Sequence, residues 1–365
     1  MKITRRTALA GAVAVGLARP ARAEGRIRLG LLHTLSPAPF YIAQQRGYFA
    51  ESGSPVDFTF FEAAQPIAAA AVAGDIDVGV TALTGGFFSL AARGALKVIG
   101  GGLHEQKGFE LTAIVVSNAA YAAGLTSVDK LAGHSFAITQ YGSSFHYMAA
   151  KMAERAGFDP KSLTLRPLQQ FGNMVAAVRT GQVDATLAIA SLARPLVANG
   201  EAHIIGWIGD WVPYQITALF ATTTMIDKRA DALHGFCDAY RKGVADYRAA
   251  FLTKGAPEAV TSAAVVDIRK FIFASDADGA QRVRDGIGWY DDGAALDVAD
   301  VKAQLAWFTE QNMVKGAINP NDIIDTRYLP TRRHPRFDCT CRASATPIAT
   351  CRCSKASIWK SPPAR

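Results

Sequence analysis

The residues with the clearest capacity for ligand chemistry lie in residues 139–146, which read Thr-Gln-Tyr-Gly-Ser-Ser-Phe-His. This segment follows an expected strand at 135–138 and opens an expected helix at 144–156. The first turn of a helix leaves backbone N–H groups unpaired and carries partial positive charge, so it can hold an anion without a basic side chain. Gly142 allows close approach of a ligand, and Ser143 and Ser144 can donate hydroxyl groups. The segment predicts a small-anion site, although Gly-Ser-Ser alone is also typical of an ordinary helix cap.

Two further expected strand-to-helix loops, at 33–40 and 81–86, have the same character. Like residues 140–144, they contain glycine or small polar residues and no Lys or Arg. In open α/β sheets the ligand binds at the carboxyl ends of the strands, and we expect all three loops to face one cleft there. They predict a small ligand held by amides and hydroxyls.

The elements that must position these loops alternate between short apolar strands and helices, which predicts an α/β fold with mostly parallel sheets. The first series of expected strands is 27–32, 56–61, 77–80 and 96–99. The second series is 135–138, 163–165, 185–189 and 203–208, with helices at 144–156, 173–181 and 191–199. The chain is then chiefly helical, at 233–251, 265–273, 280–284 and 298–312.

About 300 residues with half of them apolar suffice for two lobes with separate cores. Two longer expected strands, 111–116 and 215–222, flank the second series, and we expect them to cross between the lobes. Lobe one is then discontinuous, with residues 24–112 and 218–330, because the C-terminal helices return to it. Lobe two has residues 113–217.

The first 23 residues resemble an export signal. Arg5 and Arg6 form a twin arginine, a short Ala- and Gly-rich apolar run follows, and 21–23 read Ala-Arg-Ala. This order is typical of a secretory signal peptide of the twin-arginine type, although Ala8 stands where that pattern usually has Phe. We expect a soluble mature protein in the periplasm.

The net charge of +8 is concentrated at the two ends of the chain. Residues 1–23 contribute +5 and residues 331–365 contribute +7, which leaves −4 for residues 24–330. A basic patch with interleaved aromatics is therefore not expected in the body, and the composition argues against a nucleic-acid partner.

Residues 331–365 form an expected basic tail outside the fold. Four of the five cysteines lie there, namely Cys339, Cys341, Cys351 and Cys353. Two Cys-x-Cys pairs could bind a soft metal or form disulfides, but an appended and disordered end explains them as well. The fifth, Cys237, lies in an expected amphipathic helix and is interpreted as a buried small hydrophobe.

The body of the sequence resembles one known family. Residues 43–53 read Ala-Gln-Gln-Arg-Gly-Tyr-Phe-Ala-Glu-Ser-Gly, and 74–79 read Gly-Asp-Ile-Asp-Val-Gly. Together with Leu-Ala-Gly at 131–133 and Gly-Gln-Val-Asp-Ala at 181–185, these pieces resemble the nitrate/sulfonate/taurine periplasmic substrate-binding proteins of ABC importers. That group includes binding proteins for thiamine-pyrimidine precursors. The resemblance covers about residues 27–330.

The resemblance implies a bilobed type II periplasmic binding fold that closes on one ligand and presents it to an ABC permease. We expect a monomer without cofactor or metal. The loop at 142–144 corresponds to the family's anion-contacting helix start, and the loops containing Ser36 and Thr84 correspond to contacts from lobe one. Asn173 lies where the family often has a ligand-facing polar turn, although it could simply cap a helix.

Aromatic residues before the second crossing leave the ligand class open. Trp211 and Tyr214 could stack on an aromatic carboxylate or a pyrimidine precursor, or could pack the hinge, while sulfonates, taurine and nitrate are the leading class. His104-Glu105 could contact a ligand, although a solvated loop is the favoured interpretation. The predicted ligand-binding residues are Ser36, Phe40, Thr84, Gly85, Tyr141, Gly142, Ser143, Ser144, Asn173, Trp211 and Tyr214.

An enzyme of the same fold is the alternative from another class. Desulfinase-like and pyrimidine-synthase-like relatives use cleft Cys and His residues, whereas the predicted cleft loops of this chain contain no Cys. His33 and His146 have no partners at metal-ligand spacing. A binding protein that serves a sensory receptor instead of an importer is equally compatible with the sequence.

Overall fold

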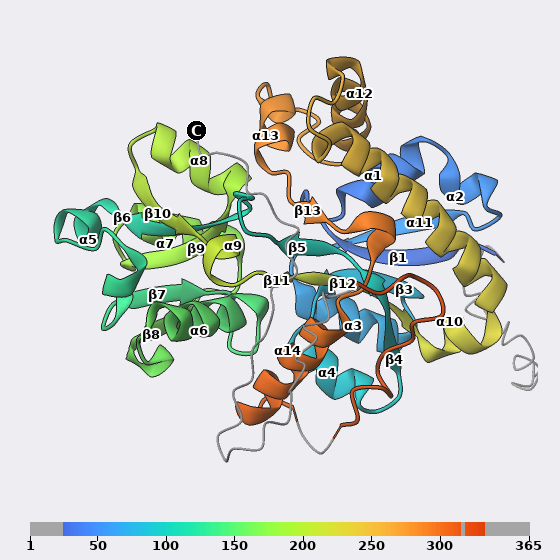
Figure 1. Cartoon of the computed structure of the whole chain (residues 1–365), viewed down its shortest axis with the longest axis horizontal. Helices are drawn as coiled ribbons and strands as arrows, with labels where there is room; N and C mark the ends of the chain where they lie inside the picture. Colours follow the sequence, from blue (N-terminus) through green and yellow to red (C-terminus); the bar gives the residue numbers. More distant parts are fainter. Residues whose placement is uncertain (1–24, 315–317, 333–365) are drawn as a thin grey trace, which may run out of the picture.

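The computed structural model describes residues 25–314 and 318–332, which form two lobes side by side (Figure 1). The expected signal peptide and the four cysteines of the expected tail lie outside these residues. Each lobe contains a five-stranded sheet, and a three-stranded sheet joins them. Within the described residues, no helix has both the length and the apolar character needed to cross a membrane.

The first sheet has the strand order β2-β1-β3-β12-β4. Its strands are β1 (Ile27–Leu32), β2 (Val56–Phe61), β3 (Val78–Ala82), β4 (Leu96–Gly101) and β12 (Thr217–Thr222). β1 pairs in parallel with β2 and β3, whereas β12 is antiparallel to β3 and β4. Four of the five strands therefore run in one direction and end at the same edge.

The second sheet has the order β10-β6-β9-β7-β8. Its strands are β6 (Thr112–Ser117), β7 (Ser135–Ile138), β8 (Thr164–Pro167), β9 (Ala185–Ile189) and β10 (Ala202–Trp207). β7 is parallel to β8 and β9, and β6 is antiparallel to both of its neighbours. The two sheets therefore share one design, with a single antiparallel strand in each.

The strands that pass between the lobes are shorter than expected. They are β5 (Leu103–Glu105) and β11 (Tyr214–Gln215), which pair with each other, and β13 (Trp289–Tyr290) pairs with β5. The prediction that 111–116 and 215–222 cross between the lobes was wrong, because β6 and β12 are interior strands of the two large sheets. β6 and β12 begin at Thr112 and Thr217, one residue before the expected lobe boundaries.

Helices cover both faces of the first sheet and surround the second. They are α1 (Ala38–Gln45), α2 (Tyr48–Glu51), α3 (Ala64–Ala73), α4 (Gly85–Ala91), α5 (Asn118–Ala122), α6 (Ser144–Ala156), α7 (Phe171–Arg179), α8 (Ala190–Ala198) and α9 (Ile208–Trp211). The C-terminal ones are α10 (Thr223–Lys228), α11 (Ala230–Phe251), α12 (Glu258–Arg269), α13 (Gly279–Asp285) and α14 (Val298–Glu310), with the 3-10 turn η3 (Asp292–Ala294). The long α11 packs against α1 and α12, and α14 packs against α4 beside the second lobe (Figure 1).

Two apolar cores support this arrangement. One lies between the first sheet and α1 and α11, where Phe40 stacks on Tyr240 with ring centres 4.0 Å apart. The other continues from the opposite face of the first sheet through Phe308 of α14 to Tyr147 of α6. The lobes are therefore joined by apolar packing as well as by the crossing strands.

Candidate functional site

A cavity lies between the lobes and is lined by both of them. Besides Gly286 and residues near the crossing strands, such as Leu103, Leu111 and Ile216, its lining comes from the segments after β1, β2 and β3 in the first lobe and after β7, β8 and β9 in the second. The space open to the centre of a water-sized sphere is about 110 Å³. Each of these segments follows the carboxyl end of a parallel strand, which is where open α/β sheets bind their ligands.

The start of α6 forms one wall of the cavity. Ser143 is the N-cap residue, and its hydroxyl accepts a hydrogen bond from the His146 N–H at 3.3 Å and donates one to the Gln140 carbonyl at 2.7 Å. Gly142 has a φ of 77°, a left-handed conformation that glycine adopts without strain. The cap interpretation is therefore correct for Ser143, while Ser144, the first residue of α6, also lines the cavity.

The opposite wall comes from the first lobe. Ser36 and Thr84 line the cavity, and the Thr84 hydroxyl also caps α4 by accepting from the Phe87 N–H at 3.0 Å. Gly85 lies beside the cavity and under Met313, because a Cβ at Gly85 would be 3.1 Å from the Met313 Cβ. Four predicted residues, Ser36, Thr84, Ser143 and Ser144, thus come together at one cavity, and their role in ligand binding stays a prediction.

Seven predicted residues do not line the cavity, and two of them, Gly85 and Gly142, only adjoin lining residues. Phe40 is fully buried under α11, and Tyr214 is buried against Tyr147 with ring centres 5.2 Å apart. Tyr141 is exposed, and Trp211 is half-buried against the core of the second lobe. Asn173 is exposed and donates to the Leu168 carbonyl at 3.0 Å, and the N-cap of α7 is not Asn173 but Gln170.

Several lining residues were not identified from the sequence. Gln169 and Ser191 follow β8 and β9, so the rule that placed the other loops at strand ends would have found them. Phe145 and Met148 line the cavity from the first turns of α6, as apolar residues that also resemble ordinary core positions. Gln65 at the start of α3 gave no sequence signal.

The cavity has little formal charge. Its lining contains no Lys or Arg, and its one acidic residue, Glu62, is exposed to solvent. Most of the lining is apolar, with hydroxyls from Ser and Thr and amides from Gln65, Gln140 and Gln169. Helix starts therefore supply the positive potential on its walls, because α3, α7 and α8 also begin at the lining, as α6 does.

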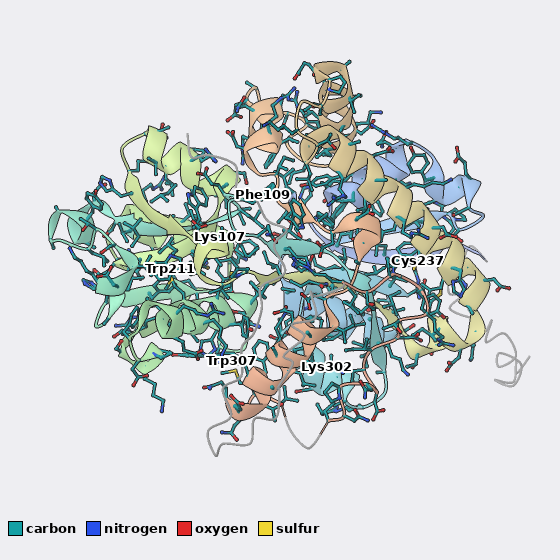
Figure 2. The ribbon with its side chains drawn as sticks, in the orientation of Figure 1. Lys107, Phe109, Trp211, Cys237, Lys302 and Trp307 are labelled. Carbon is teal, nitrogen blue, oxygen red and sulfur yellow. The ribbon has the colours of Figure 1, made fainter. Side chains whose placement is uncertain are left out.

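Direct contacts close the two lobes over the cavity. The Gly85 N–H donates to the Gly142 carbonyl at 3.0 Å, and the Gln140 side chain hydrogen-bonds to Gln65. Trp307 of α14 lies at the boundary with α6 (Figure 2), and its ring centre is 5.2 Å from that of His146. The described conformation is therefore one in which the lobes touch.

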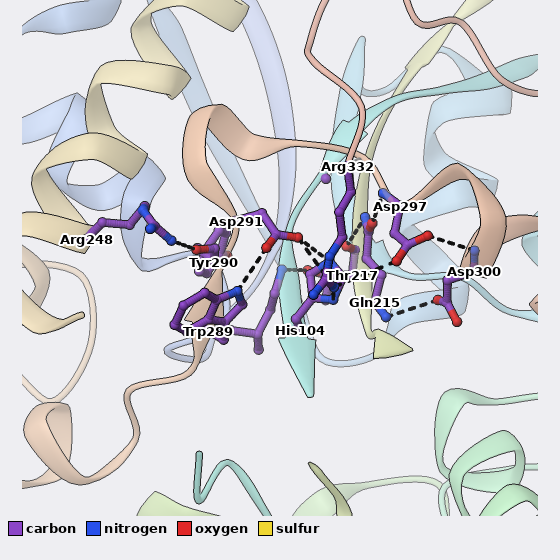
Figure 3. Close-up of polar contacts among 12 residues, drawn as sticks. His104, Gln215, Thr217, Arg248, Trp289, Tyr290, Asp291, Asp297, Asp300 and Arg332 are labelled. Carbon is purple, nitrogen blue, oxygen red and sulfur yellow. Dashed lines mark hydrogen bonds and ion pairs between the residues drawn. The ribbon is translucent and has the colours of Figure 1, made fainter. Parts of the chain in front are cut away.

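The hinge beside the cavity is polar and buried (Figure 3). His104 lies with Nε2 3.1 Å from an Asp291 oxygen and Nδ1 3.3 Å from the Arg332 guanidinium. Burial lowers the pKa of His104 to about 4, so the ring is neutral at pH 7. A proton on Nε2 then faces Asp291, and the lone pair on Nδ1 faces Arg332. The prediction that residues 104–105 form a solvated loop was wrong.

Strand β11 is tied to α14 within the same cluster. The Asp297 N–H donates to the Gln215 side-chain oxygen at 2.7 Å, and the Gln215 N–H donates to Asp300 at 3.0 Å. Burial raises the pKa of Asp300 to about 7. Arg332, which we assigned to the tail, lies 3.7 Å from both Asp291 and Asp297. The C-terminal segment therefore reaches into the hinge.

Besides the facing His104 Nε2 and Asp291 oxygen, two polar groups of the hinge have no hydrogen-bond partner among the described residues. They are the Glu105 carboxyl and the Tyr214 hydroxyl, which belong to paired positions of β5 and β11. Burial raises the pKa of Glu105 to about 8, while the nearby Thr112 opposes this rise without reaching hydrogen-bond geometry. Burial also raises the pKa of Tyr214 well above its usual value.

A reactive cysteine and a metal-binding cluster are both absent from the cavity as far as the described residues show. Cys237 lies on α11, is buried, and has its thiol pKa raised by that burial, so it cannot act as an accessible thiolate. No group of three or more His, Cys, Asp or Glu side chains in the described part of the chain is arranged to hold a metal ion.

Comparison with known structures shows the fold. The alkanesulfonate-binding protein SsuA from Xanthomonas axonopodis pv. citri, bound to MOPS, is 17% identical with a TM-score of 0.64, over 83% of this chain and 98% of that one. The aliphatic sulphonate binding protein SsuA from Escherichia coli is 17% identical with a TM-score of 0.64, over 88% and 98%. The nitrate-binding protein NrtA from Synechocystis PCC 6803 is 15% identical with a TM-score of 0.55, over 79% and 81%.

Comparison of sequences shows the family. Among proteins of curated function, nothing matches this sequence. The profile of the NMT1/THI5-like family, however, matches residues 35–250, which is more than half of the chain. The resemblance drawn from the sequence motifs is confirmed: the chain belongs to the NMT1/THI5-like family and has the α/β periplasmic binding-protein fold.

Proposed function

We propose that this protein is the solute-binding component of an ABC importer and captures a small organic anion between its lobes. The observation that carries the proposal is the cavity, which is lined by both lobes, contains the start of α6, and has no Lys or Arg in its walls. A helix start can hold an anionic group by its N–H donors and its dipole. Solved structures of the same fold include sulfonate- and nitrate-binding proteins, which supports this ligand class.

The walls indicate how such an anion would lie. Its charged group would face Ser144 and the first turn of α6, and its body would contact apolar side chains such as Leu35, Leu111 and Met148. Nitrate has no apolar part to use these contacts, so we favour alkanesulfonates among the proposed ligands. Aromatic carboxylates and pyrimidine precursors are less well supported, because Trp211 and Tyr214 do not line the cavity.

Closure of the lobes gives the proposed function its mechanism. The hydrogen bonds from Gly85 to Gly142 and between Gln65 and Gln140 join the two walls directly. A ligand that contacts both walls binds the closed form better than the open form and therefore shifts the population toward closure. We propose that the closed protein works in the periplasm as a monomer, after twin-arginine export, and delivers the ligand to a membrane permease.

A thermal-shift screen of the purified protein tests the ligand class. We would compare methanesulfonate, taurine, nitrate, benzoate and a hydroxymethylpyrimidine, with dimethyl sulfone as the neutral control of similar shape to methanesulfonate. A ligand at about 100 times its Kd stabilises the folded state by roughly 2.7 kcal/mol, which shifts the melting temperature by several degrees. A shift with methanesulfonate and none with dimethyl sulfone is expected. Equal shifts with both, or none with any anion, would contradict the proposal.

A pair of serine variants tests the position of the anion. Ser144→Ala removes a hydroxyl from the wall at the start of α6, whereas Ser162→Ala removes an exposed hydroxyl that bonds to the Asp159 carbonyl. A hydrogen bond to a charged group contributes about 1.5–3 kcal/mol, so Ser144→Ala should weaken the affinity more than tenfold. Ser162→Ala should leave it unchanged. Equal affinities of the two variants would place the anion elsewhere.

A further inference from the structure

His146 lies where the ligand wall and the contact between the lobes meet. It is the third residue of α6, and its ring is half-buried. The Gly142 N–H donates to the ring Nδ1 at 3.2 Å. Because Nδ1 accepts this hydrogen bond, the ring must be neutral, with its proton on Nε2.

The Gly142 residue is thereby held on two sides. Its N–H is bound by His146, and its carbonyl accepts from the Gly85 N–H of the first lobe at 3.0 Å. The left-handed conformation of Gly142 turns the chain into the Ser143 cap. A change at the Gly142 N–H therefore affects both the start of α6 and the hydrogen bond that joins the lobes.

The ring of His146 also touches the first lobe directly. Trp307 of α14 meets it edge to face, with ring centres 5.2 Å apart and an interplanar angle of 76°. Tyr141 lies against it at 5.4 Å and 90°. This enclosure lowers the pKa of His146 below its usual value by removing the ring from water.

We propose that His146 is a positioning residue, whose neutral imidazole holds Gly142 in the conformation that ligand binding and lobe closure require. Protonation of Nδ1 would place a donor against the Gly142 N–H and break this hydrogen bond. Affinity for the ligand then falls as the pH falls. The inference rests on the proposed binding function, and it adds a pH dependence that the helix start alone does not predict.

Among the described residues, the charged side chains on the two helices that meet at His146 are Lys151, Glu154 and Arg155 of α6 and Asp300, Lys302 and Glu310 of α14. None of them contributes to the lowered pKa of His146, which burial alone causes. On its own helix the neighbour is Tyr147, whose pKa is raised by burial, and on the preceding loop it is Tyr141. The side that faces the first lobe has the uncharged Trp307, and α4 contains no ionisable residue. Asp300 lies on α14 seven residues before Trp307.

The direction of the effect follows from proton linkage. Opening of the lobes moves His146 toward water and returns its pKa toward about 6.5, so closure on the ligand releases a proton from any protonated ring. The observed Kd is then constant above about pH 7 and rises by up to about tenfold per pH unit below the His146 pKa of the open form. A protonated ring that attracted the anion directly would give the opposite slope.

Two conservative variants separate the hydrogen bond from the ring. His146→Asn keeps an acceptor, Oδ1, at nearly the position of Nδ1 and does not titrate. His146→Phe keeps a ring and removes the acceptor. His134→Asn is the matched control, because His134 is a histidine of the same lobe that pairs with Asp184 outside the cavity.

The first readout needs no ligand. In the full-length protein, NMR chemical shifts of the Gly142 amide and the His146 ring are followed from pH 8 to pH 5. Both should titrate together with one midpoint, and His146→Asn should abolish the titration of Gly142. A Gly142 amide that does not follow His146 in the unmodified protein would overturn the inference, whether or not any ligand binds.

The second readout is the Kd for methanesulfonate over the same pH range, in buffers without a sulfonate group. At pH 8 His146→Asn should bind within about threefold of the unmodified protein, and His146→Phe about fivefold more weakly, the effect of one ordinary hydrogen bond. The affinity of His146→Asn should not change with pH, whereas His134→Asn should keep the original profile. An unchanged profile in His146→Asn, or tighter binding at low pH, would refute the inference. Absence of methanesulfonate binding at every pH would refute the proposed ligand, and the NMR titration would still decide the role of His146.

Discussion

Replacement of Glu105 by Gln should change how the stability of this protein depends on pH. The Glu105 side chain is buried in the hinge strand β5, and neither carboxyl oxygen has a hydrogen-bond partner among the described residues. Burial raises its pKa from 4.5 to about 8, so the carboxyl is protonated in the folded state at pH 7 and ionised in the unfolded state. Gln has nearly the shape of the protonated acid and does not titrate.

The magnitude follows from this shift. A raised folded-state pKa means that the contribution of Glu105 to stability is fully present below pH 4.5 and is lost as the pH rises to about 8. The loss is about 1.4 kcal/mol per pH unit, or about 5 kcal/mol over the whole window. We therefore expect Glu105→Gln to match the unmodified protein near pH 4.5 and to exceed its free energy of unfolding by about 3 kcal/mol at pH 7.

Urea unfolding at pH 5, 6, 7 and 8, followed by circular dichroism, measures this difference. The other perturbed hinge groups, His104 and Asp300, occur in both proteins, so their contributions cancel in the comparison. The difference in the free energy of unfolding should grow steadily with pH. Parallel curves for the two proteins would refute the reasoning, because they would mean that water or an unseen partner keeps the Glu105 carboxyl ionised.

Three further substitutions test other features of the site and hinge. Gly142→Val should abolish ligand binding and leave the fold intact, because the left-handed φ of 77° disfavours a side chain by at least about 1–2 kcal/mol. Calorimetric titration measures the binding, and circular dichroism checks the fold. Arg332→Ala should lower the free energy of unfolding by about 1–3 kcal/mol in urea, because it removes a cation beside the largely buried Asp291. Tyr214→Phe should raise the free energy of unfolding by about 1 kcal/mol, because the hydroxyl that it removes has no hydrogen-bond partner among the described residues. Tyr240→Phe should lower the free energy of unfolding by about as much, because it removes a 2.8 Å hydrogen bond to a carbonyl.

Controls and contrary outcomes make these tests specific. Arg241→Ala removes an exposed guanidinium paired with the exposed Asp238 and should change stability by less than about 0.5 kcal/mol. An equal loss in Arg241→Ala and Arg332→Ala would mean that Arg332 does not support the hinge. A Gly142→Val protein with normal affinity would remove the anion site from the start of α6. A Tyr214→Phe protein with weakened affinity would restore Tyr214 as a ligand contact.

The fold and part of the candidate site could be predicted because they depend on local sequence. Strands such as β1, β2 and β7 and helix α6 have the expected bounds, since a run of apolar residues or a Gly-Ser cap is specified within a few neighbouring residues. The rule that loops at strand ends converge placed Ser36, Thr84, Ser143 and Ser144 at one cavity. A consistent use of that rule would have added Gln169 and Ser191.

Contacts between distant parts of the chain decided the rest. Phe40 was expected in the same loop as Ser36, but it lies in α1 and enters the core because α11 supplies Tyr240 as its stacking partner. The hinge strands have only two or three residues each, which is too short for an alternating apolar pattern to be recognised in the sequence. β5 and β11 also pair across more than 100 residues of sequence. The burial of His104 and Glu105, and with it their shifted pKa values, results from that pairing. The sequence by itself determined which elements form; which side chains meet between the lobes depends on packing that only the tertiary structure supplies.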